Sequence, residues 1–124
     1  MSISNYLELE ILDQVFRNAA APAITTPWIS LHTADPGETG ASEATGGSYV
    51  RQSASFDVAA AGATANTGAV TFTSMPSGTL THVGVWDASS AGNFLWGGAL
   101  TASKTLNTGD TFQINAGDLD VTLD

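Results

Sequence analysis

The chain has 124 residues, which is the length of a single domain with one hydrophobic core. Twelve acidic residues against three basic ones give a formal net charge of −9, so binding to nucleic acid or to an anionic membrane surface is not expected. The absence of cysteine excludes disulfide bonds, thiolate zinc sites and a thiol nucleophile. No secretory signal or membrane-spanning pattern is found, and we expect a soluble chain.

The N-terminal part of the chain is predicted to be helical. Residues 1–24 are interpreted as a helix, over residues 4–20, with a linker, and residues 25–124 as a β-rich region of the same domain. An N-cap signal is present at Asn5, which is followed by Glu8 three residues later. Apolar residues recur at helical spacing: Leu7, Ile11, Leu12, Val15, Phe16 and Ala19. Because this stripe is wide for one small helix, we expect it either to pack on a sheet or to dock on a neighbouring subunit.

Alternating apolar and polar residues predict β-strands through the rest of the chain. The first strand covers Pro27–Thr33, and a longer alternating stretch covers Ser48–Val58. Between them, Glu38–Gly47 has no apolar period and is expected to be a long exposed loop, which either makes contacts or is passive. Residues 59–65 are interpreted as a connection to the next strand, at residues 69–73.

The densest β pattern is a hairpin over Thr79–Leu100. Its two strands are separated by Ala88–Gly92, a five-residue connection of turn-forming residues. The hairpin holds two of the three tryptophans, Trp86 and Trp96, which we expect in the core. Simple alternation places Phe94 and Trp96 on one face of the second strand.

The C-terminal segment contains short strands separated by two similar turns. Asn107–Asp110 and Asn115–Asp118 repeat the pattern Asn-x-Gly-Asp, with strands expected at residues 104–106, 111–114 and 119–123. In total the chain holds about eight strands with closely spaced turn signals. The expected fold is mainly β: an antiparallel β-sandwich, jelly-roll-like, with one N-terminal α-helix.

No arrangement of residues predicts an enzyme. His32 and His82 lie within strand patterns and match no metal or catalytic spacing, and there is no G-x-S-x-G nucleophile motif. We therefore expect no catalytic residue, no metal and no cofactor.

Two minor binding hypotheses come from residue type. Turn residues could supply oxygen ligands for Ca²⁺, although turn chemistry alone accounts for them: Asn107, Asp110, Asn115, Asp118 and Asp120. Aromatic residues could form a carbohydrate platform, although core packing is the favoured interpretation: Trp28, Tyr49, Trp86 and Trp96.

Five blocks of the sequence fall in an order that resembles a known family: Ile29–Gly37, Gly46–Gln52, Thr81–Ala88, Gly92–Lys104 and Asn107–Leu123. Together with the N-terminal helix they resemble small virion proteins of tailed bacteriophages and prophages, described as tail-fibre-like, minor tail or capsid decoration proteins. The resemblance covers nearly the whole chain and carries no catalytic motif. It implies a structural protein of the virion, made in the cytoplasm of the host bacterium.

Within this family, the compact chain without a repetitive shaft or heptad run favours a capsid decoration (cement) protein that stabilises the head. The alternative is a tail-fibre-like or minor tail protein that contacts the tail or the host surface, and a second alternative is a non-viral soluble binding module. Expected partners are further copies of the chain, as a homotrimer, and the major capsid protein or tail proteins of the same phage. The expected contact residues are Leu7, Ile11 and Val15 on the helix and Glu38 and Glu43 in the loop.

Overall fold

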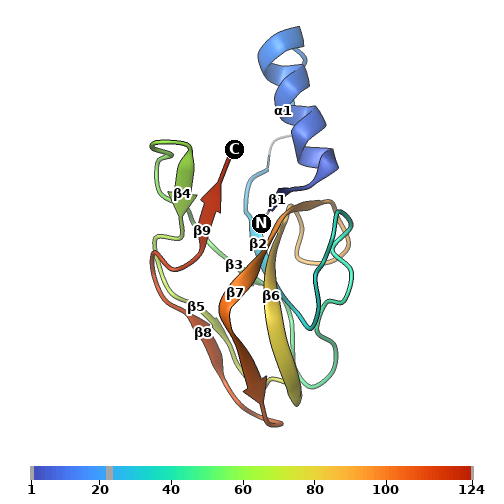
Figure 1. Ribbon diagram of the computed structural model, residues 1–124, viewed down its shortest axis with the longest axis vertical. Helices are drawn as coiled ribbons and strands as arrows, with labels where there is room; N and C mark the ends of the chain where they lie inside the picture. The colour runs from blue at the N-terminus through green and yellow to red at the C-terminus, as the bar shows by residue number, and fades with distance from the viewer. Residues whose placement is uncertain (1, 22–23, 124) are drawn as a thin grey trace.

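The computed structural model describes residues 2–21 and 24–123 (Figure 1). The elements along the chain are β1 (Ser2–Ile3), α1 (Asn5–Arg17), β2 (Trp28–His32), β3 (Gln52–Ser53), β4 (Ala63–Ala65), β5 (Val70–Phe72), β6 (Gly78–Trp86), β7 (Phe94–Leu106), β8 (Phe112–Ile114) and β9 (Asp120–Thr122). The expected mainly β fold with antiparallel sheets and an N-terminal helix is confirmed. Across the described residues, no helix is both long and apolar enough to cross a bilayer.

The strands form one large sheet and two small ribbons. The large sheet has the order β1-β7-β6-β2-β3, and the ribbons pair β4 with β9 and β5 with β8. All of these pairings are antiparallel. The four ribbon strands are only three residues long each, and the arrangement of one five-stranded sheet with two short ribbons is consistent with the expected β-sandwich.

The centre of the large sheet is the hairpin of β6 and β7, as the sequence predicts. Its register shifts near the turn, so that Val85 lies opposite Trp96 while Trp86 lies opposite Phe94. Leu95 is thus an extra residue on β7, and a bulge of this kind reverses the side on which the following side chains lie. The expectation that Phe94 and Trp96 share a face is wrong for this reason.

The two faces of the large sheet are buried by different parts of the chain. Trp96 belongs to the main hydrophobic core, which includes Ile29 from β2, Phe72 from β5 and Ile114 from β8. Phe94 lies instead against Trp86 on the other face, with ring centroids 5.2 Å apart. Both expected core tryptophans are buried, but in different layers.

A buried asparagine joins the C-terminal turns to the rest of the fold. Asn66 is 1% exposed, and its amide nitrogen donates hydrogen bonds to the carbonyl oxygens of Gly68 and Asn115. Its amide oxygen accepts a hydrogen bond from the backbone N–H of Leu119. The turn at Asn115–Asp118 is closed by a backbone bond between its two ends, at 3.1 Å, as the repeated turn pattern predicts.

The segment before the β5–β8 ribbon differs from the expected long strand. Only Gln52–Ser53 forms a ladder there, and Phe56 makes an isolated bridge with Asn66. Val58, which alternation places inside, is 94% exposed. Val50, on the same alternating set, is 61% exposed, so this segment buries too little apolar surface to stabilise a long strand. Conversely, the predicted connection contains a short strand, β4, which pairs with β9.

Candidate contact surface

The first turn of helix α1 is fixed to the strands and their connections, which together we call the β-body. Its N-cap is Ser4 rather than the predicted Asn5, and the Ser4 hydroxyl accepts a hydrogen bond from the backbone N–H of Leu7. The same hydroxyl donates to the carbonyl oxygen of Phe94, and the Ser4 N–H donates to that of Leu95, at 2.8 Å. One buried serine therefore caps the helix and attaches it to the start of β7.

The loop Glu38–Gly47, which we call the acidic loop, strengthens this attachment. The carboxylate of Glu38 accepts a hydrogen bond of 2.7 Å from the backbone N–H of Asn5. A negative charge at this position interacts favourably with the partial positive charge of a helix N-terminus. The far end of the helix is closed by Asn18, which has a left-handed backbone conformation. The helix ends at Arg17, three residues earlier than the predicted limit.

Beyond its first turns, α1 extends away from the β-body (Figure 1). None of its residues is buried. Four large apolar side chains are prominently exposed: Leu9 (64%), Leu12 (51%), Val15 (67%) and Phe16 (78%). The expectation that the apolar stripe packs on a sheet therefore holds only for its N-terminal end, where Leu7 packs against the core. We call these four residues the apolar helix face.

The structure separates the five predicted contact residues into three groups. Leu7 and Ile11 are half-buried, and Leu7 contributes to the packing of the helix on the body. Val15 is exposed on the apolar helix face. Glu38 and Glu43 both form hydrogen bonds within the chain. Leu12 and Phe16 belong to the predicted stripe but are not among the five predicted contacts, although the excess width of the stripe points to them.

Glu43 is the centre of a half-buried polar network. Its carboxylate forms a bidentate pair with Arg51, with the shortest N–O distance at 2.8 Å, and accepts a hydrogen bond from the Tyr49 hydroxyl. Arg51 Nη1 donates to the carbonyl oxygens of Ala88 and Ala91 in the β6–β7 turn. Burial raises the pKa of Tyr49 above its usual value. Through Glu43 the acidic loop is thus fastened to two other segments, the one at Tyr49–Arg51 and the β6–β7 turn.

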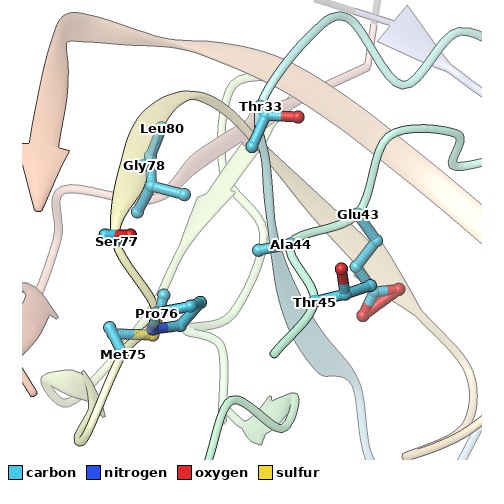
Figure 2. A pocket seen from close by; sticks show the side chains of 9 residues that line it. All are labelled: Thr33, Glu43, Ala44, Thr45, Met75, Pro76, Ser77, Gly78 and Leu80. Atoms are coloured by element: carbon cyan, nitrogen blue, oxygen red, sulfur yellow. The ribbon is translucent and has the colours of Figure 1, made fainter. Parts of the chain in front are cut away.

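A small hollow lies beside Glu43, between this loop and the segment that leads into β6. Figure 2 shows Met75 and Pro76 on one side of the hollow and Glu43 and Thr45 on the other. Its volume is about 140 Å³, below the range of about 300–1,000 Å³ typical of ligand pockets. The Glu43 carboxylate beside it is already paired with Arg51, so the hollow has no charged group free for a ligand.

A serine and a histidine do meet in the structure, in an arrangement that does not suit catalysis. The Trp86 indole N–H donates to the Ser30 hydroxyl at 2.9 Å, and Ser30 donates to His32 Nε2 at 2.7 Å. His32 Nδ1 in turn donates to the carbonyl oxygen of Ala41. Burial lowers the pKa of His32 below 6.5. Because Ser30 and His32 are both 0% exposed, no substrate reaches them, and the chain of hydrogen bonds holds the sheet against the acidic loop.

The two minor binding hypotheses gain no geometric support. Within residues 2–21 and 24–123, no three histidine or acidic side chains converge as a metal site would need. Asp110 caps its own turn by accepting a hydrogen bond from the Asn107 N–H. Trp86 and Trp96 are buried on opposite faces of the sheet, so the predicted aromatics do not form one exposed platform.

Comparison with known proteins gives one family. No curated protein sequence matches the chain. A family model described as podophage GP4 fiber I protein gp80 matches residues 2–122, which covers both α1 and every strand. This agrees with the tailed-phage virion family that the sequence resembles, and it supports the tail-fibre alternative better than capsid decoration. The chain belongs to the family of the podophage GP4 fiber I protein gp80.

Proposed function

We propose that this protein is a tail-fibre component that is attached to a neighbouring subunit of the virion through helix α1. The observation that carries the proposal is the apolar helix face, which lies on a helix projecting from the β-body (Figure 1). The description of the family model is that of a fibre protein. A fibre component must bind at least one other virion protein. A projecting helix suits this purpose because it can enter a groove of another subunit without rearrangement of the sheets.

Exposure of these four apolar side chains to water is unfavourable. Full burial of one large apolar side chain contributes about 1.5–3 kcal/mol, so four such residues are enough to drive association once part of their exposed surface is covered. Scattered apolar residues are normal on a protein surface, but Leu9, Leu12 and Phe16 lie at helical spacing on one side. Small contacts of this kind are multiplied where several copies bind one symmetric assembly.

The neighbouring subunit is either another copy of the chain, as in the expected homotrimer, or a different tail protein. At the exposed end of the helix, the positive charge of Arg17 is paired with the negative charge of Asp13 at 3.1 Å. Its apolar face therefore has no large charge to desolvate on binding to either kind of partner. Sedimentation of the purified chain distinguishes the two cases.

The test replaces two residues of the apolar helix face by polar ones of similar size, Leu12→Gln with Phe16→Gln. Both side chains are exposed, so the variant is expected to fold with an unchanged melting temperature. Phages whose gene carries the double substitution are expected to lack the protein in purified virions. The matched control is Gln14→Ala on the polar side of the helix, which should be incorporated normally.

The location is read by immunogold labelling of wild-type virions. Labelling confined to the tail supports the proposal, and labelling over the whole head would instead establish capsid decoration. Normal incorporation of the Leu12→Gln, Phe16→Gln variant would show that the helix is not the attachment site, whichever part of the virion is labelled.

A further inference from the structure

The charges on helix α1 are unevenly distributed around the apolar helix face. Within α1, Glu8, Glu10 and Asp13 are acidic, and Arg17 is the one basic residue. The charge of Asp13 is compensated by its ion pair with Arg17. Glu8 is exposed, and among the described residues it forms no ion pair. The helix therefore presents an exposed carboxylate that has no counter-ion in the described part of the chain.

Glu8 borders the apolar helix face. It precedes Leu12 by four residues and Val15 by seven, so these three side chains lie along the same side of the helix. Because the helix is attached to the β-body at its first turn, Glu8 lies nearer to the body than Leu12 and Val15 do. A protein surface that covers the face from Leu12 to Phe16 therefore comes close to the Glu8 carboxylate.

The base of the helix carries further negative charge. The Glu38 carboxylate of the acidic loop accepts a hydrogen bond from the backbone N–H of Asn5. Desolvation raises the pKa of Tyr6 above its usual value, and the nearby charges of Glu10 and Asp87 raise it further. Asp87 directly follows β6, so these acidic side chains come from three parts of the chain that meet at the helix base. The surroundings of the apolar helix face are therefore acidic where the helix joins the body.

A second copy of the chain is poorly suited to cover this surface. Of the three basic side chains, Arg17 is paired on its own helix, and that of Arg51 is 8% exposed and is also paired within the chain. Lys104 is exposed, but it lines a groove between β7 and β8 together with Asp118 and Asp120. Two copies would also bring together formal charges of −9 each. Repulsion of this kind opposes association between copies.

We infer that the apolar helix face binds a different virion protein, which presents an apolar groove with lysine or arginine side chains at its rim. This inference rests on the proposed attachment through α1 and specifies the partner. The groove takes up Leu9, Leu12 and Phe16, which have the i, i+3, i+7 spacing of the anchor residues in helix-in-groove complexes. A basic side chain at the rim interacts with Glu8, and the net charge of −9 attracts the whole chain to a basic surface.

The charges beside the face select the partner, whereas the apolar side chains supply the affinity. Burial of Leu9, Leu12 and Phe16 is favourable in any apolar groove of suitable shape. An acidic rim would repel Glu8, and an uncharged rim would reduce the hydration of its carboxylate without supplying a counter-ion. The helix thus distinguishes a basic groove from the acidic surface of its own copies.

The first experiment measures incorporation into virions. A phage from which the gene has been deleted is grown in cells that supply the protein from a plasmid, and the protein in purified virions is quantified by immunoblot. Glu8→Lys is expected to lower the amount per virion by about tenfold or more, because it places like charges together at the rim. The matched control is Asp57→Lys, which makes the same change in charge at an exposed position outside α1 and should be incorporated like wild type.

The second experiment uses Glu8→Gln, which removes the charge with little change in size. Virions that carry wild type or this variant are washed at NaCl concentrations from about 0.1 M to about 1 M, over which the Debye length falls from about 10 Å to about 3 Å. Wild type is expected to be released several-fold more at the high concentration, because salt screens its interaction with the basic rim. Release of Glu8→Gln should depend less on salt. An equal salt dependence of the two proteins would overturn the inference.

The remaining outcomes separate the inference from the proposed function. Normal incorporation of the Leu12→Gln, Phe16→Gln variant would overturn attachment through α1 itself. If that variant is missing from virions while Glu8→Lys is incorporated as well as Asp57→Lys, attachment through α1 is supported and the basic rim is ruled out. The purified chain is expected to sediment as a monomer. An oligomer that the Leu12→Gln, Phe16→Gln substitution dissociates would overturn the inference in favour of a second copy.

Discussion

The guanidinium group of Arg51 lies 3.7 Å from the centre of the Trp86 ring while its Nε and Nη2 atoms are paired with the carboxylate of Glu43. The side chain of Arg51 is only 8% exposed, so this stacked and bidentate arrangement is shielded from solvent. Arg51, which directly precedes β3, thus connects Glu43 of the acidic loop with the turn of the central hairpin. This arginine is thus a structural residue of the β-body rather than a surface charge.

The first prediction concerns this geometry. Arg51→Lys keeps the charge but cannot form the planar fork or stack on Trp86 in the same way. We expect the free energy of unfolding to fall by about 1.5–3 kcal/mol, the range of one hydrogen bond to a charged group. Urea denaturation measures the change, and Arg17→Lys, whose side chain is 70% exposed, is the control and should be nearly neutral. Equal stability of both variants would contradict the structural role of Arg51.

The second prediction concerns the glycine beneath the buried histidine. A Cβ atom at position 84 would lie 2.6 Å from Phe94, 2.7 Å from the Ser30 hydroxyl and 2.9 Å from His32 Nε2. Gly84→Ala should therefore disrupt the Trp86–Ser30–His32 hydrogen bonds and lower the stability by about 1–3 kcal/mol. Gly68→Ala is the matched control, because a Cβ atom there meets nothing within 4 Å. A difference in melting temperature between the two variants is the expected observation.

The third prediction follows from the pKa of His32. Burial lowers this pKa below 6.5, and among the nearby charges Glu43 raises it while Arg51 and His82 lower it. Below pH 6.5 the unfolded chain therefore binds more protons at this residue than the folded one, so stability is full above this pH and decreases as the pH falls. The slope is at most about 1.4 kcal/mol per pH unit for one proton.

Denaturation at a series of pH values between neutral and mildly acidic measures this slope, and an NMR titration of the His32 ring protons identifies the group. An imidazole that titrates at or above 6.5 in the folded protein would contradict the prediction.

The fourth prediction concerns Asn66. Its amide nitrogen donates to two carbonyl oxygens, so Asn66→Asp would place carboxylate oxygens against those acceptors without a donor between them. Because Asn66 is 1% exposed, the loss is expected to reach about 3 kcal/mol or more, as for other unpaired buried charges. Asn107→Asp makes the same chemical change at an exposed turn and should have little effect. Thermal unfolding of both variants is sufficient to compare them.

Much of the fold could be predicted from local patterns. The helix, the central hairpin and the two Asn-x-Gly-Asp turns were found because each is specified by residues close in sequence: a helical repeat, two alternating runs around a turn, and side chains that bond to their own backbone. The family resemblance was found in the same way, from blocks of adjacent residues. By contrast, the alternation in Ser48–Val58 predicts more strand than the structure has, because alternation alone does not show that either set of side chains is buried.

The apolar stripe of α1 could be predicted from its spacing, whereas the intramolecular bonds of the loop residues Glu38 and Glu43 could not. Whether either residue also contacts a partner stays a prediction. In the structure their partners are Asn5 and Arg51, which are 33 and 8 residues away in the sequence. Pairings of this kind depend on where the chain returns in space, and no local pattern specifies them.

The sequence by itself determined that the chain is a mainly β protein with one amphipathic N-terminal helix, since periodicity and turn chemistry are local properties. Only the tertiary structure decided which apolar residues remain outside the core. One extra residue in β7, Leu95, places Phe94 and Trp96 on opposite faces, and the Ser4 cap directs α1 away from the sheets. Both outcomes depend on registers between distant segments, and those registers are fixed by the packing of the whole chain.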